Sequence, residues 1–371
     1  MKKFTPPRRG KLKIGVLFGG KSAEHEVSLQ SARNVINALD KNKYEVVPIG
    51  INKNGKWLLH GKADYLLNAG NPKLIKLNQS SKEVAVFAES SGALTDPKSG
   101  NVRSTIDVIF PVMHGPFGED GSMQGLLKVA GIPFIGAGVL GSAVGMDKDV
   151  MKRLLKESGI PVAKFKTLHT GDKISFNEIK KTLGLPVFIK PANLGSSVGI
   201  YKVRNEKEWK EAKKSAFQYD SKIIVEEFIK GREIECSVLG NDKPVASLPG
   251  EIVLKSEFYS YDAKYIDEDS AIVEAPAKNL SKKTIKTIQD LAIRAFKILN
   301  CEGLGRVDFF LKKNGKVYVS EINTIPGFTN ISMYPKLWEA SGLSQTKLLD
   351  KLIDLALERF AKEQKLKTAF K

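Results

Sequence analysis

Cysteine is scarce in this sequence, and long apolar runs are absent. Only two cysteines, Cys236 and Cys301, occur among the 371 residues, in separate segments and without a CxxC pattern. This excludes a disulfide scaffold and fits a reducing compartment, so we expect a cytoplasmic protein in which both thiols are small buried side chains. The longest N-terminal apolar run, residues 14–18, is too short to span a membrane or to form a signal-peptide core. We therefore expect no membrane association and predict a buried strand there.

Acidic residues are few relative to basic ones. The chain has 41 Asp and Glu against 59 Lys and Arg, which gives a formal net charge of +18. Such an excess attracts phosphate-rich partners. The lysines are nevertheless spread along the chain, and the densest basic piece, at the N-terminus, holds two prolines and little that could pack. We predict a disordered basic tail over residues 1–11, a general attraction for small anions, and no nucleic-acid partner.

The length exceeds the size at which one hydrophobic core keeps growing, so two or three domains are expected. Apolar runs alternate with a helix whose apolar face includes Leu29, which indicates an α/β fold with a parallel sheet. The expected strands of this part are 12–18, 44–51, 106–113 and 132–135. Further along, helices are expected over 148–158, 206–218, 281–299 and about 344–360, and strands over 186–190, 199–203 and 223–227. We place three domains at 12–137, 138–225 and 226–371.

A hairpin in the last domain carries the most specific signal. Asn314-Gly315 is a strong two-residue turn signal, and a turn fixes the register of its flanking strands. A two-residue turn at this point puts Asp308 opposite Glu321 and Arg306 opposite Asn323. Because side chains alternate between the two faces of a strand, all four side chains are predicted to share one face.

The predicted pairing of Asp308 with Glu321 is unfavourable by itself, because like charges opposite each other in a sheet repel. Carboxylate and amide oxygens are hard ligands that suit Mg²⁺ or Mn²⁺, with phosphate oxygens completing the coordination. The sequence therefore predicts a metal site made by Asp308, Glu321 and Asn323. An ion-pair cluster of Arg306, Asp308 and Glu321 without metal is the alternative.

A second signal is a strand that delivers Lys190 into a loop of small residues, Gly195-Ser196-Ser197. Backbone N–H groups and hydroxyls in such loops can bind phosphate oxygens. The loop is not a Walker A motif, because no GK[ST] follows, and residues 15–20 do not spell GxGxxG. Together with the predicted metal hairpin, Lys190 and this loop favour nucleotide binding over a simple turn.

The segment around Glu226, Phe228, Ile229 and Glu233 fits the same interpretation. It ends an expected strand and enters a turn at Gly231. An apolar wall with carboxylates beside it could accept an adenine and a ribose, whereas a solvated strand end is the alternative.

Eight blocks of this sequence, in this order, resemble the D-alanine–D-alanine ligase family of the ATP-grasp superfamily. The resemblance covers roughly residues 12–360. Its blocks are GGKSAEHEVSL (19–29), HGPFGEDG (114–121), MDK (146–148), KPANLGSSV (190–198), EEFIKGRE (226–233), YSYDAKY (259–265), GRVD (305–308) and EINTIPGFT (321–329).

The resemblance implies a fold and a set of cofactors. The expected fold is a three-domain ATP-grasp architecture, with an N-terminal Rossmann-like parallel sheet and two α+β lobes that sandwich ATP. The expected cofactors are ATP and two Mg²⁺ (or Mn²⁺) ions per active site. The family also implies a homodimer.

The resemblance further implies roles for residues on the nucleotide side. Lys148, Lys190 and Ser197 would contact phosphates, and Lys264 would reach the γ-phosphate. Glu226, Phe228 and Ile229 would line the adenine site, with Glu233 at the ribose. The metal ligands that it implies are Asp308, Glu321 and Asn323, in agreement with the hairpin argument.

On the substrate side, the resemblance implies that Arg306 and the Gly327 N–H hold an oxyanion. Glu24 would bind the ammonium of a first D-alanine, near His114, and Ser332 with Met333 would lie at the second. Ser196, Tyr265 and Glu24 would form a hydrogen-bonded set under a lid formed by residues 255–270. His25 is expected to begin a helix.

The implied activity is ATP-dependent ligation of two D-alanines through a D-alanyl phosphate, for peptidoglycan precursor synthesis. D-Lactate or D-serine as the second substrate is the nearest alternative, and Tyr265 argues against lactate. A nucleotide sensor or nucleic-acid binder without catalysis is the alternative from another class, and Asp308, Glu321 and Asn323 together with Arg306 argue against it.

Overall fold

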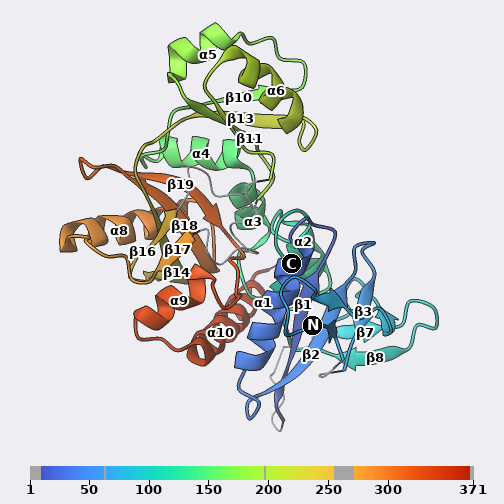
Figure 1. Ribbon diagram of the computed structural model, residues 1–371. Helices are drawn as coiled ribbons and strands as arrows, with labels where there is room; N and C mark the ends of the chain where they lie inside the picture. The colour runs from blue at the N-terminus through green and yellow to red at the C-terminus, as the bar shows by residue number, and fades with distance from the viewer. Residues whose placement is uncertain (1–9, 62–63, 196–197, 255–270, 368–371) are drawn as a thin grey trace.

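The computed structural model describes residues 10–61, 64–195, 198–254 and 271–367. The predicted basic tail lies almost wholly outside these residues, as do Ser196, Ser197, Lys264, Tyr265 and the predicted lid. Within the described residues, three larger sheets and two short ladders carry the strands, and helices pack between and over them (Figure 1). No helix in these ranges is long and apolar enough to cross a membrane.

The first sheet has the order β6-β3-β2-β1-β9. Its centre is parallel: β1 (Leu12–Gly19) pairs with both β2 (Tyr44–Ile51) and β9 (Val108–Val112). Because a parallel strand is covered on both faces, its sequence reads as a continuous apolar run, and all five residues of β9 are buried. The parallel sheet predicted from these runs is confirmed.

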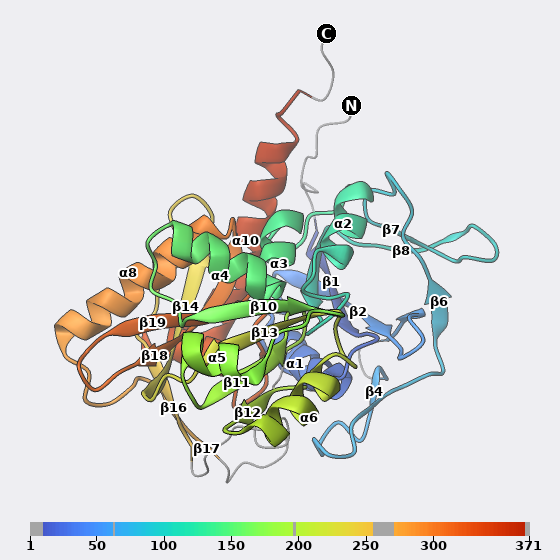
Figure 2. The same ribbon diagram turned by 90° about the horizontal axis from the view of Figure 1, so that it is seen from above.

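Helices and short edge strands complete this part of the chain. The helices are α1 (His25–Ala38), α2 (Ser122–Val129) and α3 (Val139–Met146). The edge strands β3 (Trp57–Leu59) and β6 (Lys82–Val84) are antiparallel. Two short ladders, β4 (Leu66–Leu67) with β5 (Lys76–Leu77) and β7 (Ala93–Thr95) with β8 (Val102–Thr105), complete the set. The ladder of β7 and β8 lies at the outer edge of the first sheet, far from the other sheets (Figures 1 and 2).

The strand predicted over 132–135 is wrong as a full strand. The segment makes one isolated parallel bridge, Ile109 with Phe134. Ile109 N–H donates to the Pro133 carbonyl and Ile135 N–H donates to the Ile109 carbonyl. Pairing does not extend further, because Pro133 has no N–H to donate and Gly136, with a φ of 103°, turns the chain away.

The second sheet is antiparallel, with the order β10-β13-β11-β12. Its strands are β10 (Phe165–His169), β11 (Val187–Pro191), β12 (Tyr201–Val203) and β13 (Lys222–Glu227). α5 (Phe176–Leu183) and α6 (Glu206–Ala216) cover one face, where Ile179 and Trp209 join the strand side chains in one apolar core. α4 (Lys148–Glu157) lies between this sheet and the third sheet (Figure 1).

The third sheet has the order β17-β16-β14-β18-β19, and β15 pairs with β14. Its strands are β14 (Arg232–Gly240), β15 (Val245–Ala246), β16 (Gly250–Leu254), β17 (Ala271–Glu274), β18 (Gly303–Leu311) and β19 (Val317–Asn323). α8 (Lys282–Ile298) packs on one face, and its core includes α4 side chains such as Met151. α9 (Met333–Ala340) and α10 (Gln345–Glu363) share a second core with α1 and β1, which joins the third sheet to the first.

Both cysteines are buried in the core of the third sheet, as predicted. Burial raises the pKa of each thiol to about 12, so neither forms a thiolate near neutral pH.

The β18–β19 hairpin differs from its prediction in a way that leaves the predicted pairs unchanged. The predicted two-residue turn is wrong: Lys312 pairs with Lys316 through the Lys312 N–H, and the connection has three residues, ending in Gly315 at a φ of 81°. This shifts the register by one residue from Leu311 to Phe309. A bulge at Ser320 then shifts it back, so that Asp308 faces Glu321 and Arg306 faces Asn323.

We expect Gly141→Ala to destabilise the protein by about 1–3 kcal/mol, because overpacking forces neighbours to move. A Cβ on Gly141 in α3 would meet the Asn300 carbonyl just before β18. The matched control is Gly125→Ala in α2, where a Cβ meets no atom within 4 Å and alanine should stabilise the helix by about 0.5–1 kcal/mol. Urea unfolding of both variants measures the difference, and equal effects would contradict this packing argument.

Candidate active site

A cavity of about 100 Å³ lies where loops of the first sheet meet the third sheet. Predicted residues from both ends of the chain line it: Glu24, His114, Arg306, Glu321, Asn323, Gly327, Ser332 and Met333. The segment that follows β11 reaches the same place, since Gly195 also lines the cavity and a Cβ on it would lie 3.2 Å from the Glu24 Oε2. Lys148 lines an adjoining cavity together with Glu321 and Asn323. The structure therefore brings most of the predicted substrate-side residues together.

The predicted metal ligands are arranged around an arginine. The Arg306 guanidinium binds both oxygens of Asp308 at 2.7 Å, and its Nε lies 2.9 Å from Glu235 Oε2 on β14. Asn323 Nδ2 donates to Asp308 Oδ2 at 3.0 Å, and Glu321 lies 3.9 Å from Lys148 Nζ. The Arg306–Asp308 pair belongs to the ion-pair alternative, whereas Glu321 is paired with a different cation.

The donor atoms of these side chains determine whether they can hold a metal. In the part of the chain that the structure describes, no group of three or more His, Cys, Asp and Glu side chains is arranged to hold a metal. The predicted set offers two carboxylates and an amide, all hard oxygen donors. Such a set fits a cation whose remaining ligands are phosphate oxygens and water, and it does not form a complete protein cage.

A buried carboxylate between two lysines forms the other side of the site. Glu226 is 3% exposed on β13, and Lys190 Nζ of β11 lies 2.5 Å from its Oε2. Lys152 of α4 pairs with Oε1. Burial opposes the charge of Glu226, but the two ammonium groups outweigh it and hold the pKa of this carboxyl below its usual range. The solvated strand end considered for Glu226 is therefore wrong.

The remaining nucleotide-side residues lie on neighbouring elements. Ile229 is buried, and Phe228 is 38% exposed, with Phe188 at 5.9 Å between ring centroids and Lys202 Nζ 4.8 Å from its ring. Glu233 lies on β14, two residues before Glu235, and faces Phe310 of β18. Glu233 and Glu235 therefore share the face of the sheet that carries Asp308.

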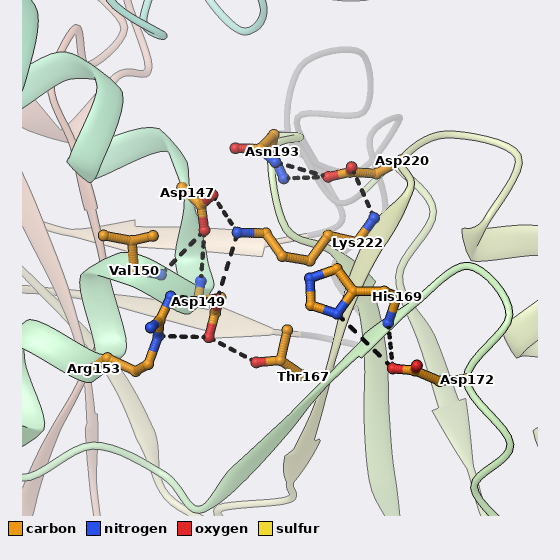
Figure 3. Close-up of polar contacts among 10 residues, drawn as sticks. All are labelled: Asp147, Asp149, Val150, Arg153, Thr167, His169, Asp172, Asn193, Asp220 and Lys222. Carbon is orange, nitrogen blue, oxygen red and sulfur yellow. Dashed lines mark hydrogen bonds and ion pairs between the residues drawn. The ribbon is translucent and has the colours of Figure 1, made fainter.

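A polar network outside the cavity holds the start of α4 against the second sheet (Figure 3). Asp147 caps α4 by accepting from the N–H groups of Asp149 and Val150 at 3.1 Å. Lys222 Nζ on β13 lies 2.5 Å from Asp147 Oδ2 and 3.5 Å from Asp149 Oδ2. Because Lys148 is the first residue of this capped helix, the network fixes the backbone position of that lysine.

The segment of residues 192–194, which follows β11, is anchored to the same network, because Asp220 also accepts from the Lys222 N–H. Asp220 accepts from the backbone and side-chain amides of Asn193 at 2.8 and 3.0 Å (Figure 3). Lys148 Nζ donates to the Leu194 carbonyl at 2.7 Å, and its backbone N–H donates to Ala192. The lysine and the loop are therefore held in one unit.

Side chains of α1 and of the segment after β9 hold the loop that carries Gly327 by hydrogen bonds. His114 Nδ1 lies 3.0 Å from the Ile325 carbonyl, while its Nε2 lies 3.2 Å from Ser31 Oγ. The Phe328 N–H donates to Ser31 Oγ, and Asn34 Nδ2 donates to the Phe328 carbonyl. Since both neighbours of the Pro326-Gly327 pair are held, the direction of the Gly327 N–H is set by side chains of α1 and by His114.

Glu119 also holds this loop, and its role was not predicted from the sequence. Its two oxygens accept from the N–H groups of Gly115, at 2.8 Å, and Ile325, at 3.0 Å. Burial and the neighbouring Glu24 raise the pKa of Glu119 to about 8.

Three residues of the site were missed, each with a signal in the sequence. Lys152 lies one helical turn after Lys148, on the same face. Glu235 follows Glu233 by two positions on a strand, and Glu119 lies within the 114–121 block. His25 begins α1, as predicted, and its Nδ1 lies 2.9 Å from the Gly20 carbonyl.

Comparison with known proteins agrees with this geometry. The family model described as D-ala D-ala ligase N-terminus matches residues 13–137, and the D-ala D-ala ligase C-terminus model matches residues 154–354. The D-alanine–D-alanine ligase of Oceanobacillus iheyensis is 54% identical over 97% of this chain and 99% of its own. D-Alanine–D-alanine ligase A of Escherichia coli K12 is 54% identical over 96% of this chain and 99% of its own.

Solved structures show the same relationship. The D-alanine–D-alanine ligase of Coxiella burnetii superposes with a TM-score of 0.83 at 41% identity, covering 96% of both chains. The VanG D-Ala:D-Ser ligase of Enterococcus faecalis has a TM-score of 0.80 at 39% identity and covers 94% of this chain and 100% of its own. A Bacillus anthracis D-alanine–D-alanine ligase complexed with ATP has a TM-score of 0.72 at 32% identity and covers 96% of this chain and 100% of its own.

The mixed α/β fold and the matches along nearly the whole chain define a ligase. More narrowly, the chain belongs to the D-alanine–D-alanine ligase family.

We expect the contribution of Glu119 to the stability of the substrate-free protein to fall as pH rises from about 5 to 8. The folded pKa of Glu119, about 8, lies above its usual value, so in this window the folded state retains a proton that the unfolded chain has lost. Above pH 8 this contribution is constant. Urea unfolding at pH 5, 6.5 and 8, compared with Glu119→Gln, measures it. The wild type should lose stability relative to the variant between pH 5 and pH 8, and an identical change in both proteins would contradict the assignment.

Proposed function

We propose that this protein joins two D-alanines to D-alanyl-D-alanine in the cytoplasm, with ATP converted to ADP and phosphate, for peptidoglycan precursor synthesis. The observation that carries the proposal is the convergence of Glu24, Arg306, Glu321, Gly327 and Ser332 on one cavity. The 54% identity with D-alanine–D-alanine ligases over nearly the whole chain supports it.

The proposal includes a three-domain ATP-grasp layout, with ATP between the second and third sheets. Each larger sheet supports one of the domains predicted at 12–137, 138–225 and 226–371. The boundary at 225/226 falls inside β13 (Lys222–Glu227), so we propose to move it to the turn after that strand. A homodimer is also proposed, from the family resemblance alone.

On the nucleotide side, Lys148 and Lys190 would hold the phosphates, and Ile229 and Phe228 would contact the adenine beside Glu226. Glu233 would hold the ribose. Two Mg²⁺ or Mn²⁺ ions held by Asp308, Glu321 and Asn323 would offset the negative charge of the phosphates. Ser197 and Lys264 also belong to this proposal, from the resemblance alone, because they lie outside the described residues.

On the substrate side, Glu24 would hold the ammonium of the first D-alanine. A carboxylate oxygen of this D-alanine would then attack the γ-phosphorus, and ADP would leave. The amine of the second D-alanine, placed by Ser332, would then attack the carbonyl carbon of the D-alanyl phosphate. Arg306 and the Gly327 N–H would stabilise the oxyanion, and phosphate would leave as the amine loses its proton. Ser196 and Tyr265 would close the site against water, again from the resemblance alone.

The second candidate is a D-alanyl-D-serine ligase, because the VanG D-Ala:D-Ser ligase superposes at a TM-score of 0.80. Both candidates use the same first substrate. They differ in the amine that is accepted at the second position.

Phosphate release from ATP separates the two candidates. We expect release with D-alanine alone and little with L-alanine, D-serine or D-lactate offered separately. D-Alanine and D-serine offered together should give mainly D-alanyl-D-alanine by mass spectrometry. A predominance of the D-serine product would favour the second candidate, and no D-alanine-dependent release would reject the proposed function.

We expect Glu321→Gln to retain the fold and to lose turnover by roughly 10²–10³-fold, because one charged metal ligand is lost from the site of phosphoryl transfer. The matched control is Glu339→Gln, an exposed glutamate on α9. Steady-state rates at several Mg²⁺ concentrations measure the effect. Near-normal turnover of Glu321→Gln at ordinary Mg²⁺ would show the metal assignment to be wrong.

A further inference from the structure

Lys152 is a fully buried lysine, with 0% of its side chain exposed. A buried ammonium is costly unless it is paired and hydrogen-bonded. Burial lowers the pKa of Lys152, against the opposing effect of Glu226. None of the roles proposed above for the nucleotide, the metal or the two substrates uses this lysine.

The contacts of Lys152 join two parts of the site. Its Nζ pairs with Glu226 Oε1 on β13, in the second sheet. The same nitrogen donates to the Ser320 carbonyl on β19, in the third sheet, at 3.0 Å. The partner of Glu226 Oε2 is Lys190, so the two lysines hold this carboxylate from both sides.

Ser320 is the residue at which β19 bulges. From Leu311 to Phe309, the pairing of β18 with β19 is shifted by one residue from the pairing at Asp308 and Arg306. The shift occurs between Phe309 and Asp308, where Ser320 is the extra residue of β19. The extra residue of a bulge has no partner across the ladder. The Lys152 ammonium supplies a hydrogen-bond donor to the carbonyl at this point.

The bulge decides which way Glu321 faces. If the displaced register continued past Phe309, Ser320 would lie opposite Asp308, and Glu321 would lie opposite Val307, which is 0% exposed. A one-residue shift moves a side chain to the other face of the sheet. The predicted metal ligand would then point into the core and away from Asp308.

We infer that Lys152 is a positioning residue that stabilises the Ser320 bulge and thereby holds Glu321 beside Asp308, while it also holds Glu226. This inference rests on the proposed function for the roles of Glu226 and Glu321. It predicts that loss of the ammonium weakens metal binding at Asp308, Glu321 and Asn323.

The test compares Lys152→Met with the wild-type protein. Methionine has a similar length without charge. The Mg²⁺ concentration needed for half-maximal ATP binding should rise at least about tenfold, because outer partners of metal ligands commonly affect metal affinity by 10–100-fold. ATP binding in EDTA, which reports the Glu226 side alone, should weaken less. Calorimetric titration gives both values without relying on turnover.

The control is Lys166→Met. Lys166 of β10 pairs with Glu178 of α5, on the face of the second sheet opposite α4, and has no contact with Ser320 or Glu226 among its hydrogen bonds and ion pairs. Its Mg²⁺ requirement should stay within about twofold of the wild type. A Lys152→Met protein that is less stable but has a wild-type Mg²⁺ requirement would overturn the inference.

If Lys152→Met does not fold, Lys152→Met/Glu226→Gln removes two of the three buried charges of the cluster with Lys190 and is compared with Glu226→Gln alone. The double variant should need more Mg²⁺ than the single variant, because the Ser320 carbonyl still lacks its donor. Equal requirements would overturn the inference. This test is separate from the test of the proposed function. The proposed function fails if the wild-type protein binds ATP with Mg²⁺ but shows no D-alanine-dependent phosphate release.

Discussion

One extra residue in β19 determines the geometry of the candidate active site. The turn of the β18–β19 hairpin and the apolar side chains next to it set a register that would bury Glu321. The bulge at Ser320 reverses this, so that Asp308, Glu321, Arg306 and Asn323 share one face. The bulge lies against α4, whose Lys152 bonds the Ser320 carbonyl and whose Lys148 lies near Glu321. The position of α4 therefore matters as much to the site as the hairpin itself.

The site is assembled from elements that are far apart in sequence, and the contacts between them are mostly polar. The loop around Gly327 follows β19, yet its backbone is held by Ser31, Asn34, His114 and Glu119, all from the first sheet's part of the chain. Polar contacts of this kind are directional. They can fix an N–H vector in a way that apolar packing cannot, which suits a group proposed to bind an oxyanion.

Much of the fold could be predicted from the sequence, because its strongest signals are local. The central strands β1, β2 and β9 are continuous apolar runs. The helices α8 and α10 have amphipathic periods. The pairing of Asp308 with Glu321 was also predicted correctly, but through an incorrect turn whose one-residue error the bulge compensates. A bulge of this kind has no signal in a single sequence, because a polar residue such as Ser320 fits either register. Lys152 was missed for a similar reason: lysines on a basic helix normally face water, and burial depends on a carboxylate that lies more than seventy residues later in the chain.

The net charge of +18 does not extend into the site. Among the described residues around the cavity and the nucleotide side, the carboxylates Glu24, Glu119, Glu226, Glu233, Glu235, Asp308 and Glu321 outnumber the cations Lys148, Lys152, Lys190, Lys202 and Arg306. Retention of a proton by Glu119 near neutral pH lessens this imbalance without removing it. A nucleoside triphosphate entering such a site would meet net repulsion from like charges. Its binding therefore requires cations that the described residues do not supply, and divalent ions on the face of Asp308 and Glu321 meet that requirement. Under the proposed function, these local carboxylates are the physical reason to expect that nucleotide binding depends on metal.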